Sequence, residues 1–150
     1  MINRRTARTG FLHFSQRIDY GLLLLTELAR RGKKVCVSLR KISDENGISF
    51  FFLQKVASDL RKAVLVNADR GKNGGYALAK EARYITLLEI LEAIEGPLNV
   101  MPCLGNGAGV SCARSKRCSI RPGLNFINQT IIKALSETTL ADLTTNYGQA

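Results

Sequence analysis

The chain has 150 residues, of which 45% are hydrophobic and 23% charged, which are ordinary values for one soluble globular domain. Lys and Arg number 22 against 12 Asp and Glu, so the net charge is +10 and a polyanionic partner is expected. The apolar run at residues 22–25 is far shorter than the roughly 20 residues of a membrane-spanning helix. No secretory signal pattern follows the N-terminal arginines, so we expect a cytosolic protein that binds nucleic acid rather than a membrane.

The first predicted elements are three helices that follow a basic N-terminal extension at residues 1–13. Helical spacing of apolar residues predicts one helix over residues 16–31, which ends at a glycine. A second helix is predicted over residues 37–46, with Ser38 as its N-cap and Gly47 at its end. Ser49 can cap a third helix that reaches about residue 63. Two helices joined by a tight turn at Gly47 form a helix-turn-helix.

A β-hairpin is predicted next, because two short apolar runs at residues 64–66 and 76–78 flank a glycine-rich turn. Its tip is basic, and a basic hairpin directly after a helix-turn-helix is typical of the wing of a winged helix. One more amphipathic helix is predicted over residues 85–95. We therefore assign residues 14–96 to a winged helix-turn-helix domain, and the fold class is mainly α with a small β-hairpin wing.

The last predicted helix begins near Pro122 and ends near Glu137. Its apolar stripe consists of Leu124, Ile127, Ile131 and Leu135. A long helix with such a face at the end of a small domain favours pairing with a second copy, and packing on its own domain is the alternative. We assign residues 121–150 to a dimerisation helix and a C-terminal tail.

The third helix is the candidate recognition helix, because the second helix of a helix-turn-helix enters the DNA major groove. Gln54 can bond an adenine through its two-sided amide, and Lys55 can contact a guanine or a phosphate. Of Phe50 and Phe51, one is expected to pack the start of the helix on the core and the other to meet a thymine methyl. The alternative for the basic side chains of the wing, Arg70 and Lys72, is that they only solvate a surface. The predicted DNA-binding residues are Ser49, Phe51, Gln54, Lys55, Arg61 and Lys62 of the helix, and Arg70 and Lys72 of the wing.

Residues 97–120 form a candidate cluster-binding loop that contains Cys103, Cys112 and Cys118. No acidic residue lies between Gly96 and Ser136, and the surrounding positive charge offsets the charge of a thiolate-ligated group. Structural zinc usually takes four Cys and His ligands in tighter pairs, so three spaced thiols fit an iron–sulfur cluster better. A reversible disulfide between two of them remains an alternative.

The whole pattern resembles the Rrf-type family of winged-helix iron–sulfur regulators, the IscR- and NsrR-like proteins. The resemblance covers residues 14–146 and includes the three cysteines. The matching segments are RIDYGL from Arg17, SLRKIS from Ser38, FLQK from Phe52, LRKA from Leu60, RGKNGGYAL from Arg70 and ITLLEILEAIEG from Ile85.

This resemblance implies a homodimer on a palindromic operator in double-stranded DNA, with Gln54 and Lys55 reading bases and Arg70 in the minor groove. It also implies that Cys103, Cys112 and Cys118 ligate the cluster. The interval between the first two cysteines is longer than usual in the family, and Arg121 stands where IscR-like members have a histidine. NsrR-like members use a carboxylate of the other subunit, and Asp19 occupies the matching position, so a four-iron four-sulfur cluster is favoured over a two-iron two-sulfur cluster.

These observations predict a transcriptional regulator that senses nitric oxide, redox or iron–sulfur status through a labile cluster. One alternative is a clusterless winged-helix regulator with a thiol switch or a metabolite signal. An iron–sulfur electron-transfer or carrier protein is an alternative of another class. An enzyme is not expected, because the chain has no paired carboxylates, phosphate loop or nucleophile–base set.

Overall fold

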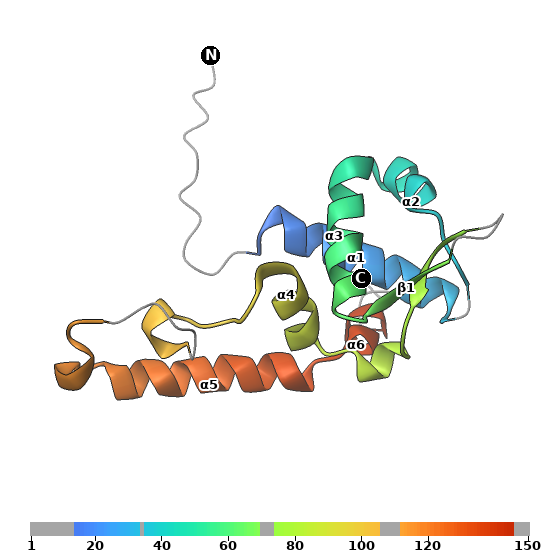
Figure 1. The fold of residues 1–150 in the computed structure, drawn as a ribbon. Helices are drawn as coiled ribbons and strands as arrows, with labels where there is room; N and C mark the ends of the chain where they lie inside the picture. Colours follow the sequence, from blue (N-terminus) through green and yellow to red (C-terminus); the bar gives the residue numbers. More distant parts are fainter. Residues whose placement is uncertain (1–13, 34, 70–73, 106–111, 146–150) are drawn as a thin grey trace, which may run out of the picture.

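The computed structural model describes residues 14–33, 35–69, 74–105 and 112–145, and Figure 1 shows how their elements are arranged. A head contains α1 to α4, the β1–β2 hairpin and α6, and α5 extends from it as an arm. The fold is therefore mainly helical with one two-stranded hairpin, as predicted. The elements are α1 (Gln16–Arg31), α2 (Leu39–Asn46), α3 (Phe50–Lys62), β1 (Val66–Asp69), β2 (Gly75–Leu78), η1 (Ala82–Tyr84), α4 (Leu87–Glu95), η2 (Pro102–Leu104), η3 (Ser115–Arg117), α5 (Arg121–Glu137) and α6 (Leu140–Thr145).

The core of the head lies between α1, α3 and α4, which pack against one another. Their apolar residues recur at helical spacing, so each helix turns one stripe inward. Burial of these side chains is the main stabilising contribution to the head. The fully buried large side chains of this core include Leu24, Leu25, Leu28, Leu53, Val56, Leu60, Ile90 and Leu91.

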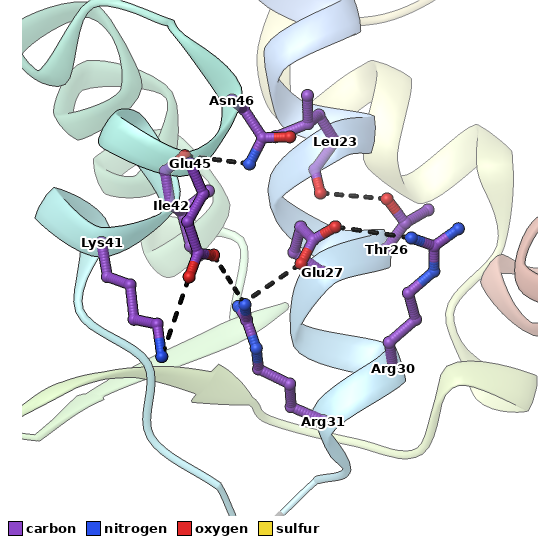
Figure 2. Close-up of polar contacts among 9 residues, drawn as sticks. All are labelled: Leu23, Thr26, Glu27, Arg30, Arg31, Lys41, Ile42, Glu45 and Asn46. Carbon is purple, nitrogen blue, oxygen red and sulfur yellow. Dashed lines mark hydrogen bonds and ion pairs between the residues drawn. The ribbon is translucent and has the colours of Figure 1, made fainter.

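Ion pairs fasten the C-terminal end of α1 to α2, as Figure 2 shows. Arg31 Nη2 lies 2.8 Å from Glu45 Oε2, and Arg31 Nη1 lies 3.4 Å from Glu27 Oε2. Glu27 also pairs with Arg30, and Glu45 with Lys41. Because Arg31 bridges carboxylates of two helices, the network opposes rotation of α2 relative to α1.

The hairpin has the register Val66↔Leu78 to Asp69↔Gly75. An isolated bridge between Val37 and Tyr76 adds a third segment to its other side, so α2 begins at Leu39 and not at residue 37. A Cβ on Gly75 would lie 2.4 Å from Val37 O, which explains the glycine at this close approach.

The strand expected at residues 64–66 is wrong by two residues, because β1 begins at Val66. Val64 has φ 58°, and its N–H donates to Arg61 O while Leu65 N–H donates to Leu60 O. These two bonds form a Schellman motif that ends α3. Val64 and Leu65 therefore follow the C-cap residue Ala63 and close the end of α3.

Two regions of the C-terminal half differ from the prediction or extend it. The helix expected over residues 85–95 begins at Leu87, and Thr86 caps it in a reciprocal capping box with Glu89. α5 has the predicted extent, but the sequence pattern did not reveal α6, whose Leu140 is fully buried in the head.

The apolar stripe of α5 is divided between two environments. Leu135 packs against the core of the head. Leu124 and Ile131 are half-buried, whereas Ile127 is 47% exposed and lies beside Phe126, which is 69% exposed. In the described part of the chain, no helix has the length and apolar character needed to cross a bilayer.

Candidate DNA interface and cysteine loop

The turn between α2 and α3 is held by a buried serine. Gly47 ends α2 with φ 63°, a left-handed conformation that glycine adopts without strain. Ile48 N–H donates to Ser43 O, and Ser43 Oγ donates to Ile48 O at 2.7 Å. Ser43 is 4% exposed, so these bonds are shielded from water and fix the angle between the two helices. A serine inside a helix carries no distinctive sequence signal, so the sequence did not indicate this role of Ser43.

α3 presents the predicted recognition residues to solvent. Ser49 Oγ accepts a hydrogen bond from Phe52 N–H, which confirms Ser49 as the N-cap. Leu53, Val56, Ala57 and Leu60 face the core. The side chains that remain outside are Ser49, Phe51, Gln54, Lys55, Arg61 and Lys62.

The two phenylalanines at the start of α3 have different environments. Phe50 is half-buried, and the Arg40 guanidinium lies 4.2 Å from its ring centroid in a cation–π contact. Phe51 is 77% exposed and meets Phe50 edge to face. Phe50 is thus the residue that packs the helix start, and Phe51 is free to meet a ligand.

An ion pair joins α3 to α1. Arg17 Nη2 lies 2.8 Å from Asp59 Oδ2, and Lys62 Nζ lies 3.2 Å from Asp59 Oδ1. Lys62 therefore shares its charge with a carboxylate, whereas no ion pair involves Lys55 or Arg61 in the part of the chain that the structure describes. The basic tip of the wing, with Arg70 and Lys72, lies outside the described residues.

The cysteine loop lies at the end of α5 that points away from the head (Figure 1). Cys103 lies in η2, Cys118 precedes α5, and both are half-buried, as is Cys112. All three are free thiols. Among the described residues, no three Cys, His, Asp or Glu side chains are grouped to hold a metal ion, and residues 106–111 of the loop are not described.

Asp19, the predicted carboxylate ligand, lies in the first turn of α1 and is exposed. One turn earlier, Ser15 caps α1, and its Oγ donates to Glu95 Oε1 at 2.6 Å. The start of α1 is thus tied to the end of α4, immediately before the cysteine loop. The structure does not bring Asp19 together with the cysteines of the same chain.

Residues 14–146 match the Rrf2 family, which is described as iron-dependent transcriptional regulators. The chain therefore belongs to the Rrf2 family. It is 32% identical over 128 residues to the HTH-type regulator NsrR of Bacillus licheniformis, a match that covers 85% of this chain and 89% of that protein. Identity to IscR of Klebsiella pneumoniae is 29% over 127 residues, covering 85% and 76% of the two chains.

Among solved structures, CymR, the global cysteine regulator of Bacillus subtilis, superposes with a TM-score of 0.74 at 31% identity. The match covers 89% of this chain and 97% of CymR. This Rrf2-family protein is thus a helix-turn-helix transcriptional regulator and, as such, a DNA-binding protein rather than an enzyme. Its relatives include a cysteine regulator as well as NsrR and IscR, so family membership alone leaves the signal open.

Proposed function

We propose that this Rrf2-family protein is a homodimeric regulator that binds a palindromic operator and senses nitric oxide, redox or iron–sulfur status through a labile cluster in the cysteine loop. The observation that carries the proposal is the set of three free, half-buried thiols in the loop at the outer end of α5. These thiols lie in a stretch that contains no acidic residue between Gly96 and Ser136.

The donor set fits an iron–sulfur cluster by its chemistry. Thiolates are the usual ligands of such clusters, and Arg114, Lys116, Arg117 and Arg121 supply positive charge around them. Cys103, Cys112 and Cys118 would hold the cluster, with Asp19 of the partner subunit as the fourth ligand and a four-iron four-sulfur composition favoured. When bound, such a cluster supplies redox chemistry and an iron site with a weakly held oxygen ligand.

The DNA contacts come from α3 and the wing. Gln54 and Lys55 contact base edges, Phe51 meets a thymine methyl, and Ser49, Arg61 and Lys62 hold the phosphate backbone. Arg70 and Lys72 reach the adjacent minor groove. Two heads of one dimer place their recognition helices about one helical turn of DNA apart, which matches a palindromic site.

Homodimerisation is supported by the exposed apolar surface on the outer half of α5. Phe126 and Ile127 of α5 are 69% and 47% exposed, and Ile120 at its N-cap is 65% exposed. Large exposed apolar side chains gathered in this way mark an interaction surface. A symmetric pairing of two such helices covers the same residues on both subunits. A change in the loop then reaches the head through α5, and the operator affinity changes only if the two arrangements of the dimer differ in stability.

The decisive experiment compares the visible absorption spectrum, iron content and sulfide content of anaerobically purified wild type, Cys103→Ala, Asp19→Ala and Cys36→Ala. We expect cluster bands in the wild type, their loss in Cys103→Ala and an altered spectrum in Asp19→Ala. Cys36→Ala is the matched control, because Cys36 lies beside Val37 in the head, away from the loop. A colourless wild type after anaerobic reconstitution contradicts cluster sensing.

A second candidate is a clusterless regulator that uses a thiol switch or a metabolite signal. It is favoured by the observation that the described residues form no metal-holding group, and by the likeness to a cysteine regulator. Full operator binding by a Cys112→Ser variant would favour this candidate. In both cases, the family assignment favours a regulator over an electron-transfer or carrier protein.

A further inference from the structure

Asn128 is a buried polar residue in a helix that is otherwise largely exposed. It is 6% exposed and is the single buried residue of α5. A buried amide requires hydrogen-bond partners, because one without them has lost its bonds to water and gained nothing in return. Asn128 finds its partners at the start of the cysteine loop. Its Oδ1 accepts from Val100 N–H at 2.7 Å, and its Nδ2 donates to Asn99 Oδ1 at 3.4 Å.

The segment that Asn128 holds leads directly into the turn that carries Cys103. Leu104 N–H donates to Met101 O, and Gly105 N–H donates to Pro102 O, so residues 101–105 form a compact turn. The side-chain amide of Asn99 also packs against the end of this turn, since a Cβ on Gly105 would lie 3.0 Å from Asn99 Nδ2. Asn99 therefore contacts both Asn128 and the far end of the Cys103 turn.

Cys118 is attached to the same helix by a different route. Its carbonyl oxygen accepts from Arg121 N–H at 3.3 Å, at the first residue of α5. Asn128 lies seven residues after Arg121, which corresponds to about 10 Å along α5. Cys118 is thus placed by the start of α5, and the Cys103 segment is placed by a side chain farther along α5.

We propose that Asn128 is a positioning residue that holds the Cys103 segment on α5 and thereby sets the placement of Cys103 relative to Cys118. This inference rests on the proposed function for its consequence, which is that Asn128 controls how stably the thiols hold a cluster. This positioning requires the side-chain oxygen that accepts the hydrogen bond from Val100 N–H. Filling the same volume with an apolar side chain does not replace that oxygen.

The test uses the full-length, reduced, cluster-free protein and measures the alkylation rate of each cysteine by iodoacetamide labelling and peptide mass spectrometry. Two variants of similar volume separate positioning from packing: Asn128→Leu fills the site without an acceptor, and Asn128→Asp keeps one. Asn125→Ala is the matched control, because Asn125 is an exposed asparagine of the same helix. Hydrogen exchange of the peptide that contains Val100 reports directly on the bond to Asn128.

We expect Asn128→Leu to raise the alkylation rate of Cys103 about fivefold, the population change that corresponds to one net hydrogen bond of about 1 kcal/mol. The rate at Cys118 stays at the wild-type value, Val100 loses exchange protection, and Asn128→Asp restores the slow rate at Cys103. A wild-type rate at Cys103 in Asn128→Leu overturns the proposal. An equal rise in the alkylation rates of Cys103 and Cys118 also overturns it, because that result reports general loosening of α5. A Cys103 rate in Asn128→Asp as high as in Asn128→Leu overturns it as well.

A second arm separates this inference from the proposed function. Wild type, Asn128→Leu and Asn128→Asp are reconstituted anaerobically, and the loss of cluster absorption in air is followed over time. We expect the fastest loss in Asn128→Leu. If the wild type takes up no cluster, the proposed function fails, and the alkylation rates of the cluster-free protein still decide whether Asn128 positions Cys103.

Discussion

Thr86 and Thr139 form an antiparallel bridge that joins the start of α4 to the start of α6. Leu87 N–H donates to Thr138 O, and Leu140 N–H donates to Ile85 O, each at 2.8 Å. Each threonine also caps its helix, Thr86 together with Glu89 and Thr139 together with Asp142. The C-terminal end of α5 is therefore joined to the head by two backbone hydrogen bonds and by the N-caps of α4 and α6. We expect α5 and the head to move as one unit.

Removing one of these caps should weaken that junction. Thr86→Ala deletes the acceptor for Glu89 N–H, and we expect it to lower the free energy of unfolding by about 1 kcal/mol. Urea denaturation followed by circular dichroism measures the change. Thr130→Ala is the control, because Thr130 is exposed on α5 and its hydroxyl bonds only to its own helix. Equal stability of Thr86→Ala and wild type would contradict a contribution from the cap.

The carboxylate of Glu89 in the same cap makes the free energy of unfolding depend on pH. Partial burial alone would raise the pKa of Glu89, but hydrogen bonds from Lys80 and from Thr86 outweigh it, so its pKa lies below the ordinary value. A lowered folded pKa contributes stability above the unfolded pKa of about 4.3, and this contribution is lost as the pH falls through the folded pKa. We expect Glu89→Gln to be less stable than wild type at pH 7, and the difference to vanish in acid. A difference that is constant from pH 7 to pH 3 would exclude the carboxylate as its source.

Val64 offers a stabilising substitution. Its φ of 58° is unfavourable for a β-branched side chain, and it occupies the position after a helix end where glycine is usual. The side chain is 67% exposed, so little packing is lost on its removal. We expect Val64→Gly to raise the free energy of unfolding by about 1 kcal/mol, measured by thermal and urea denaturation. Val35→Gly, at another exposed valine, is the control and should give no gain.

The recognition helix predicts two kinds of loss in DNA binding. Gln54→Ala should lower the affinity for a palindromic site selected from a random DNA pool by about 1–3 kcal/mol, with relaxed specificity at one position of each half-site. Arg61→Ala should weaken binding to all sequences similarly and reduce the salt dependence. Lys133→Ala, on the exposed face of α5, is the charge-matched control. Uniform weakening by Gln54→Ala would show that it does not read a base.

The exposed half of α5 predicts the oligomeric state. Phe126 is 69% exposed, and placing a charge there opposes burial between two copies. We expect sedimentation velocity to show a dimer for the wild type and a monomer for Phe126→Asp, with unchanged helix content. Gln129→Asp, at a polar exposed position of the same helix, is the control. A wild-type monomer at micromolar concentration would contradict the proposed homodimer.

The sequence by itself determined the features that depend on local patterns. Helical spacing indicated the extent of α1 and α5, together with the glycine that ends α1 and the proline in the first turn of α5. Ser49 was recognisable as the N-cap of α3 because its hydrogen bond is made within one turn. The predicted contacts with DNA, the cluster ligands and the partner's Asp19 remain predictions, because they concern groups outside the chain.

Only the tertiary structure decided the features that join distant parts of the chain. α6, the Thr86–Thr139 bridge and the burial of Asn128 depend on contacts between residues 28 to 55 positions apart. No local pattern encodes such contacts, since burial and hydrogen-bond pairing of this kind exist only once the chain has folded.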